Sequence, residues 1–110
     1  MGRSESLDSE EIKFICGQVL RGRTDRQIQS DLAEYWGQGD LRTIRYVRRV
    51  FEAGKEVLME SLARTGYSVE GGLADKVKEA VDIVEHLGRG LRPVLNKKTG
   101  KMEYETWLEI

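Results

Sequence analysis

The sequence has few of the residues from which covalent cross-links, metal sites and membrane spans are built. Its 110 residues include one cysteine and one histidine, so an internal disulfide is impossible and a Cys/His metal site lacks ligands. No apolar run approaches the ~20 residues of a membrane-spanning helix. The N-terminus MGRSESLDSEE has no apolar stretch typical of a secretory signal. We therefore expect a cytoplasmic protein with no metal, other cofactor or membrane partner.

Groups that could carry out catalysis are also scarce. Cys16 falls on an apolar helical stripe, which favours a role in core packing. His86 has no second histidine to work with, and no pair of nucleophile and base is visible. We expect that the chain is not an enzyme, and an enzyme is the most distant of the alternatives.

The periodicity of apolar residues predicts a mainly α fold in three parts. Residues 1–6 form a disordered tail, residues 7–64 a helix-turn-helix domain with an extended third helix, and residues 65–110 a packing or dimerisation segment made of a helix and a β-hairpin. A chain of this length buries roughly 65% of its unfolded surface, which is enough for one core.

The first two helices have clear start and stop signals. Asp8 is a good N-cap and Gly22 is placed to end the first helix. Thr24 and Gln27 form a T-x-x-Q capping box at the start of the second helix, which ends before Gly37. The apolar positions predicted to face the core are Ile12, Ile15, Cys16, Val19, Leu20, Ile28, Leu32 and either Tyr35 or Trp36.

The third helix begins after Asp40, a second N-cap, and its apolar pattern continues to about Arg64. It would be ~35 Å long at 1.5 Å per residue, so its second half needs a partner beyond the first two helices. A fourth helix follows from Leu73 to Leu87, with Val81 and Val84 among its apolar positions. The last segment predicts a β-hairpin, in which residues 91–95 and 101–110 flank the turn NKKTGK.

Arginine is concentrated in the middle of the chain. The net charge is −1, whereas residues 21–49 contain seven arginines and four acids, so a basic surface must be local. If the apolar residues of the third helix face the core, Arg42, Arg45 and Arg49 share another face, with Thr43 and Tyr46 beside them. These five residues are our candidates for DNA contact, since guanidinium and hydroxyl groups bind base edges and phosphates. The candidates for flanking phosphate contacts are Arg21, Arg23, Arg26 and Arg48.

The runs LDSEEI, VLRGRTDRQI and RTIRYV are similar to the helix-turn-helix domains of LuxR-type regulators, and more broadly to resolvase-like and homeodomain-like tri-helical units. The similarity covers residues 7–50. It implies that Thr24 caps the scaffold helix and that Ile28 and Leu32 fill the core. It also implies that Thr43, Arg45 and Tyr46 approach DNA.

Two features depart from that family's pattern. Gln29 stands where a small alanine usually lets the two helices close, and the turn EYWGQGDL is longer than the usual three or four residues. These features decide whether the third helix is presented at an angle at which it can read DNA.

The leading hypothesis is a sequence-specific DNA-binding protein, a bacterial or phage transcriptional regulator. Its partner would be double-stranded DNA, bound by a homodimer joined through the second half of the third helix, the fourth helix and the hairpin. A phage small-terminase-like DNA-packaging subunit is a variant of this hypothesis, by analogy of fold.

Two other interpretations stay open. In one, the arginines are solvated or pair with Asp31, Glu34 or Glu52, and the domain is a protein-interaction or assembly adaptor that does not bind DNA. In the other, the fourth helix and the hairpin form a winged helix, with lysines 97, 98 and 101 at the tip of the wing.

Overall fold

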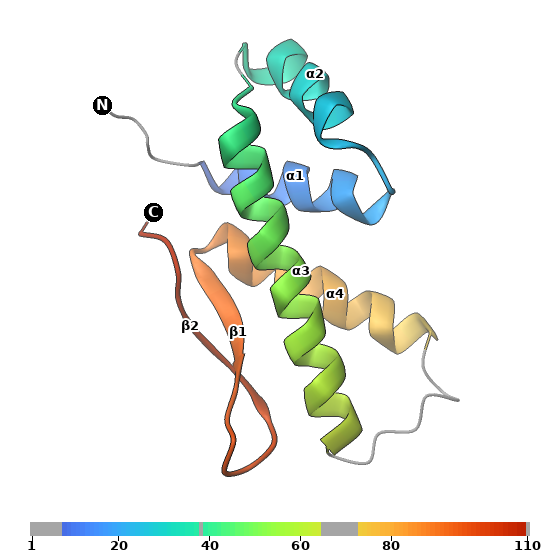
Figure 1. Cartoon of the computed structure of the whole chain (residues 1–110), viewed down its shortest axis with the longest axis vertical. Helices are drawn as coiled ribbons and strands as arrows, with labels where there is room; N and C mark the ends of the chain where they lie inside the picture. The colour runs from blue at the N-terminus through green and yellow to red at the C-terminus, as the bar shows by residue number, and fades with distance from the viewer. Residues whose placement is uncertain (1–7, 38, 65–72, 110) are drawn as a thin grey trace.

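The computed structural model describes residues 8–37, 39–64 and 73–109, and within them all side chains except those of residues 73–77. It contains helices and a two-stranded antiparallel hairpin, as the sequence predicts (Figure 1). The predicted tail, residues 1–6, lies outside the described residues. The elements are α1 (Ser9–Leu20), α2 (Asp25–Trp36), α3 (Leu41–Arg64), α4 (Leu73–Gly88), β1 (Leu91–Leu95) and β2 (Met102–Thr106).

The predicted caps begin the first three helices. The Asp8 carboxylate accepts a hydrogen bond from the amide two residues further on, at 3.2 Å. Thr24 and Gln27 form the complete capping box, with bonds of 3.2 and 2.9 Å between each side chain and the other's amide. Asp40 accepts from the amide of Arg42 at 2.9 Å. These bonds satisfy amides that a helix leaves without partners at its start.

One hydrophobic core joins α1, α2, α3 and α4. Trp36 is half-buried and Tyr35 is exposed, which decides between the two residues proposed for the end of α2. Leu20, predicted to lie in the core, is 45% exposed at the last residue of α1. The side chains with no exposed surface are Ile12, Ile15, Cys16, Ile28, Ile44, Val47, Phe51, Ile83 and Leu87.

The buried stripe of α4 differs from the predicted one. Val81 is 47% exposed, whereas Ile83 is fully buried. Ile83 and Leu87 are four residues apart and therefore share one helix face, whereas Val81 lies two residues from Ile83 and points elsewhere. Leu73, also predicted for this stripe, has its side chain outside the described residues.

The second half of α3 finds its partners within the chain. It packs against α4 and β1 (Figure 1). Gly54 allows the closest approach, since a β-carbon there would lie 2.8 Å from Cγ of Pro93 and 3.5 Å from Cγ2 of Ile83. The Ser61 hydroxyl donates to the carbonyl of Gly100 at 3.1 Å and so fixes the hairpin turn to the end of α3.

The hairpin is shorter at its end than the sequence suggests. The strands pair from Leu91 with Thr106 to Leu95 with Met102, and β2 ends at Thr106 although alternation of residues continues to position 110. The amides of Trp107 and Leu108 turn to the carbonyl of Gly90, at 2.9 and 3.3 Å. These bonds take the two residues out of the ladder and bring Trp107 towards α3.

Candidate nucleic-acid interface

The connection between α2 and α3 is short. α2 continues through Trp36 and α3 begins at Leu41, so residues 37–40 alone join them, and the longer turn predicted from EYWGQGDL is wrong. Gly37 adopts a left-handed conformation with φ of +73°, and its amide donates to the carbonyl of Ala33 at 3.0 Å. This conformation favours glycine, and it ends α2.

Gln29 fastens this connection to α2. Its side-chain amide donates to the carbonyl of Gly39 at 3.1 Å. The backbones also lie close together, since a β-carbon on Gly39 would be 2.7 Å from the carbonyl oxygen of Gln29. The residue that departs from the helix-turn-helix pattern thus bonds the residues before α3 to α2.

Three of the predicted DNA-contact residues lie on the outward face of α3. Ile44 and Val47 have no exposed surface and anchor the opposite face in the core. Arg42, Arg45 and Arg49 are exposed, with 59% of the Arg45 side chain accessible. The first half of α3 therefore presents guanidinium groups to solvent.

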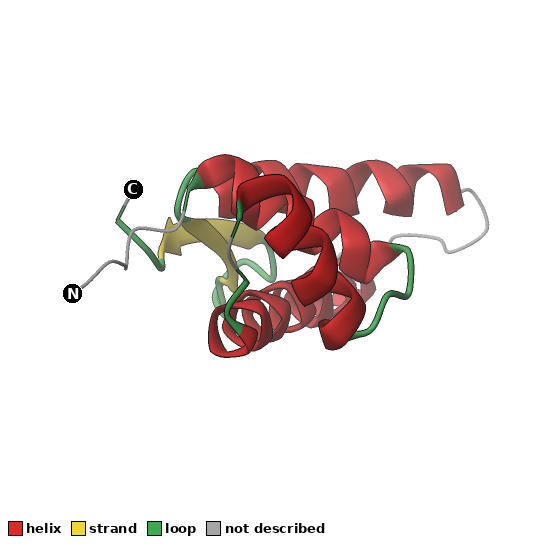
Figure 2. Ribbon diagram, turned by 90° about the horizontal axis from the view of Figure 1, so that it is seen from above, coloured by secondary structure: helices red, strands yellow, loops and turns green. Residues whose placement is uncertain are grey.

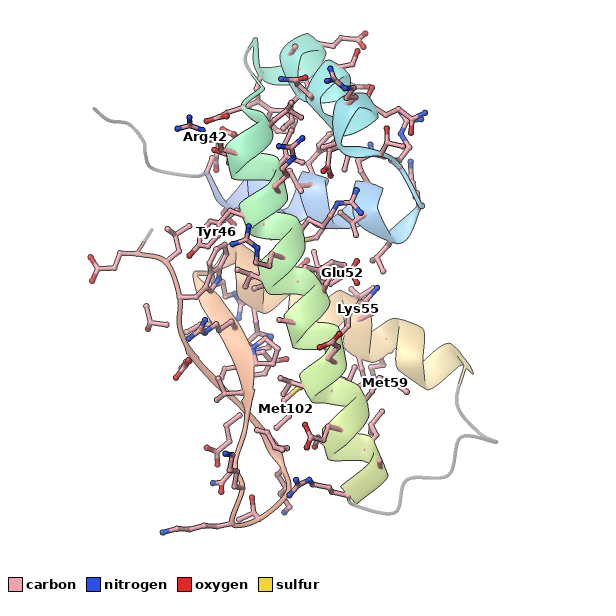
Figure 3. The ribbon with its side chains drawn as sticks, viewed as in Figure 1. Arg42, Tyr46, Glu52, Lys55, Met59 and Met102 are labelled. Carbon is pink, nitrogen blue, oxygen red and sulfur yellow. The ribbon has the colours of Figure 1, made fainter. Side chains whose placement is uncertain are left out.

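Thr43 and Tyr46 are placed differently from these arginines. Thr43 is half-buried, and its hydroxyl donates to the carboxylate of Asp40 at 3.4 Å. Tyr46 is 42% exposed, and its ring centroid lies 5.4 Å from that of Trp107. Figure 3 shows Arg42 and Tyr46 along the flank of α3 that faces the hairpin side. Trp107 of the C-terminal segment thus positions Tyr46. The sequence around Tyr46 does not predict this contact, because Trp107 lies far away along the chain.

The predicted phosphate-flanking arginines divide into two groups. Arg48 bonds Asp25 through Nε at 2.7 Å and the carbonyl of Arg23 through Nη2 at 2.7 Å. Arg23 in turn bonds the Asp31 carboxylate at 2.8 Å. The Arg48 guanidinium thus joins α3 to the start of α2, and the Arg23 guanidinium ties the segment before α2 to the middle of that helix. The other two, Arg21 and Arg26, are exposed.

Asp25 is the acid around which this junction is arranged. Besides Arg48, it lies 3.6 Å from Nε of Arg45. The ion pair of Asp31 with Arg23 confirms that an arginine pairs with one of the three acids predicted for this role. Glu52, another predicted acid, pairs with Lys55 at 3.5 Å on α3 itself.

The outward face of α3 changes sign along its length. The arginines occupy its first half, and Glu52, Glu56 and Glu60 follow in the second half with their side chains at the surface. The i, i+4 spacing of these glutamates was visible in the sequence, although their relation to the arginines was missed there. The face available for an anion is therefore confined to the start of the helix.

A groove lies between α3 and β1, next to the exposed arginines. Its volume is about 350 Å³, and its lining includes Tyr46, Arg49, Gly54, Val57, Arg92 and Pro93. Arg92 bonds the Glu105 carboxylate through both Nε and Nη2, at 2.9 and 2.6 Å. The groove is mainly apolar with arginine at its edge.

α4 has the features of a packing helix. Ile83 and Leu87 bury one side of it, and Glu85 pairs with Lys13 of α1 at 3.2 Å. That carboxylate, by hydrogen bond and charge, raises the pKa of Lys13. Glu85 is exposed on α4, with Glu79 and Asp82 half-buried on the same helix, and these acids do not favour the winged-helix interpretation, in which α4 would enter DNA.

The Cys16 thiol is fully buried in the core. Burial raises the pKa of the Cys16 thiol to about 12, which keeps it protonated. Within residues 8–37, 39–64 and 78–109, no three His, Cys, Asp or Glu side chains are grouped so that they could hold a metal ion. None of the described helices is both long enough and apolar enough to span a membrane.

Comparison of the chain with protein-family models, with curated proteins and with solved structures finds no match. The similarity of residues 7–50 to helix-turn-helix domains stays a prediction. The interpretation of this interface therefore depends on its geometry and charge.

Proposed function

We propose that the protein binds double-stranded DNA and that the first turns of α3 enter the major groove. The observation that carries the proposal is the exposure of Arg42, Arg45 and Arg49 on the side of α3 opposite the fully buried Ile44 and Val47. A rigid helix that presents several guanidinium groups suits recognition of guanine edges and phosphates.

The remaining predicted residues take different roles in this proposal. Arg21 and Arg26 are exposed next to the start of α2, where phosphate contact would fix the orientation of the protein. Arg48 acts as a positioning residue, because its bonds to Asp25 and to the carbonyl of Arg23 join α3 to the start of α2, while Arg23 ties the residues before α2 to Asp31 within it. Tyr46 would contact DNA from the flank of α3 next to Trp107.

The acidic half of α3 sets a limit to the DNA contact. Glu52, Glu56 and Glu60 would be repelled by phosphates if the whole helix lay in the groove. The helix must therefore approach DNA with its first half, as the recognition helices of tri-helical units do.

A single unit of this kind reads a short site, so we also propose a homodimer on paired half-sites. The second half of α3, α4 and the hairpin are the segments proposed for it, with exposed Met59 and Val81 as apolar contacts. The biological role that follows is transcriptional regulation in a bacterium or phage, with DNA packaging as the variant.

Selection of bound duplexes from a random pool tests the proposal directly. We expect enrichment of a sequence that contains guanine at the positions read by arginine. Light scattering on the selected duplex would give the number of chains bound to it. A pool that shows no enrichment, with a well-folded protein, would contradict sequence-specific binding.

The groove between α3 and β1 supports a second candidate, the protein-interaction adaptor. Its apolar floor and the arginines at its edge fit a peptide that carries apolar and acidic side chains. Substitution separates the two candidates. Val57→Glu and Val94→Glu would impair a peptide-binding groove, whereas a DNA-binding surface made by Arg42 and Arg45 would keep most of its affinity.

A further inference from the structure

The charged residues on the outward face of α3 are evenly spaced on the two sides of the level of Phe51, with arginines before it and glutamates after it. Arg42 lies nine residues before Phe51 and Glu60 nine residues after it. Arg45 lies six residues before and Glu56 five after it. Arg49 and Glu52 complete the series at two residues before and one after. Each arginine thus has a glutamate at nearly the same distance on the other side of the helix centre.

These six side chains also share one side of the helix. At 3.6 residues per turn, their positions fall within a sector of about 80° around the helix axis. They lie at the surface, with side-chain exposures of 59% for Arg45, 46% for Glu52 and 53% for Glu60. Figure 2 shows α3 nearly end-on at one edge of the molecule, and the start of α2 lies beside it, where Asp25 contacts Arg45 and Arg48.

We propose that a second copy of this chain docks on this face with its α3 antiparallel to the first. A two-fold axis would run perpendicular to the two helices, between them and at the height of Phe51 along α3. It would place each arginine opposite a glutamate of the other copy. The pairs would be Arg42 with Glu60, Arg45 with Glu56 and Arg49 with Glu52, each formed twice. Such an interface is isologous, as closed dimers require.

A small residue beside the charged sector permits close approach of the two helices on that side. Ala53 is exposed at the level of the proposed axis, about 20° outside the charged sector on the side of Tyr46 and Val57, and its small side chain favours a separation of 8–10 Å between the helix axes there. Tyr46 and Val57 lie along one edge of the charged sector and would face each other across the axis, adding apolar contact.

Pairs within one chain leave the charges available for this contact. Arg45 lies 3.6 Å from Asp25, Glu52 3.5 Å from Lys55 and Glu60 3.1 Å from Arg64. Exposed pairs of this kind contribute little and are screened by salt. A partner that places opposite charges along the whole face adds to them and reduces the repulsion among neighbouring like charges.

The dimer would use the arginines proposed to contact DNA. Self-association and DNA binding would therefore exclude each other, so that the α3 dimer is an autoinhibited form. This consequence rests on the proposed function, whereas the dimer itself does not. The dimer proposed for paired half-sites forms on DNA and leaves the outward face of α3 free, so it is a different assembly and does not contribute to association measured without DNA.

Charge reversal with reconstitution tests the α3 dimer without DNA. One variant carries Arg45→Glu and Arg49→Glu, and the other carries Glu52→Arg and Glu56→Arg. Each alone places like charges opposite each other, whereas an equimolar mixture restores every opposite pair in a heterodimer. Lys97→Glu with Lys98→Glu, at the exposed hairpin tip, is the control for a change of charge elsewhere.

Sedimentation equilibrium at low salt is the measurement. We expect the parent and the control to dimerise, each reversal variant to associate on the order of tenfold or more weakly, and the mixture to regain the parent's affinity. Raising the salt should dissociate the parent. A monomeric parent, reversal variants that associate as strongly as the parent, or a mixture without recovery would each overturn the α3 dimer.

The DNA proposal has a separate readout on the same samples. Glu52→Arg with Glu56→Arg keeps all the arginines of the first half of α3, so it should bind duplex DNA at least as tightly as the parent. A parent that dimerises as described and never binds DNA would contradict the proposed function and leave the α3 dimer intact. A parent that is monomeric without DNA and binds DNA would contradict the α3 dimer and leave the proposed function intact.

Discussion

The side-chain amide of Gln29 donates a hydrogen bond to the carbonyl of Gly39 at 3.1 Å. Through this bond, α2 holds the turn that leads into α3. The angle between the two helices depends on that turn, and with it the direction in which the arginines of α3 point. A residue that departs from the pattern expected of helix-turn-helix domains thus contributes to the position of the proposed interface.

Replacing Gln29 should loosen this turn. Gln29→Ala removes the donor to a half-buried carbonyl, so we expect the free energy of unfolding to fall by about 1 kcal/mol. Gln29→Glu keeps the length of the side chain and cannot donate when ionised, so it should cost at least as much. Urea denaturation measures both, with the exposed neighbour Ser30→Ala as control. Equal stability of Gln29→Ala and the parent would show that the bond does not hold the turn.

Two helix glycines should respond in opposite ways to alanine. A β-carbon at Gly17 would meet no atom within 4 Å, so Gly17→Ala should stabilise the protein by about 0.5–1 kcal/mol through helix propensity. A β-carbon at Gly54 would lie 2.8 Å from the Pro93 ring. Gly54→Ala should therefore destabilise by about 1–3 kcal/mol, because β1 must move away from α3. Thermal denaturation compares the two, and a gain in stability at both positions would contradict the packing of Pro93 on α3.

Cys16 should be unreactive in the folded protein. Its thiol is buried and its pKa is raised to about 12, so a thiol reagent at pH 8 should modify it at the rate of unfolding. In the unfolded state the thiol ionises near pH 9, so the stability should fall as the pH rises from there towards 12.

Cys16→Ala provides the control for this dependence on pH. It should lose part of the alkaline fall in stability. The remaining fall in stability is due to Tyr104, since burial and then the charges of Asp82 and Glu79 raise the pKa of its hydroxyl. Fast labelling of native Cys16 would contradict its place in the core.

The bond from Arg48 to Asp25 should matter for stability more than for direct DNA contact. Arg48→Ala removes bonds of 2.7 Å to Asp25 and to the carbonyl of Arg23, and we expect it to cost about 1–2 kcal/mol. Arg49→Ala, one residue further on and exposed, should leave the stability nearly unchanged. Chemical denaturation distinguishes them, and an equal effect of the two substitutions would show that Arg48 does not join α2 to α3.

The helix boundaries could be predicted because the signals for them are local. The capping box of Thr24 and Gln27 and the cap at Asp40 involve residues within three positions of one another. Amphipathic periodicity likewise placed Ile44 and Val47 in the core. These features follow from neighbours in the sequence, so a single sequence is sufficient for them.

Contacts between distant residues could not be predicted in the same way. The bond from Arg48 to Asp25 joins residues 23 positions apart, and the contact of Tyr46 with Trp107 depends on how the hairpin folds back. The choice of Ile83 over Val81 for the core also depends on the direction from which α3 packs. The alternation of polar and apolar residues after Thr106 was misleading, because the Gly90 carbonyl turns the chain there.

The salt dependence of DNA binding tests the central claim most directly. The parent should bind a duplex with an affinity that falls steeply as salt rises, because arginines displace ions from phosphates. Arg45→Ala with Arg49→Ala should weaken binding and flatten that slope, whereas Lys97→Ala with Lys98→Ala, an equal loss of charge at the hairpin tip, should leave both unchanged. If the arginine variant binds as tightly as the parent with the same slope, α3 is not the surface that contacts DNA.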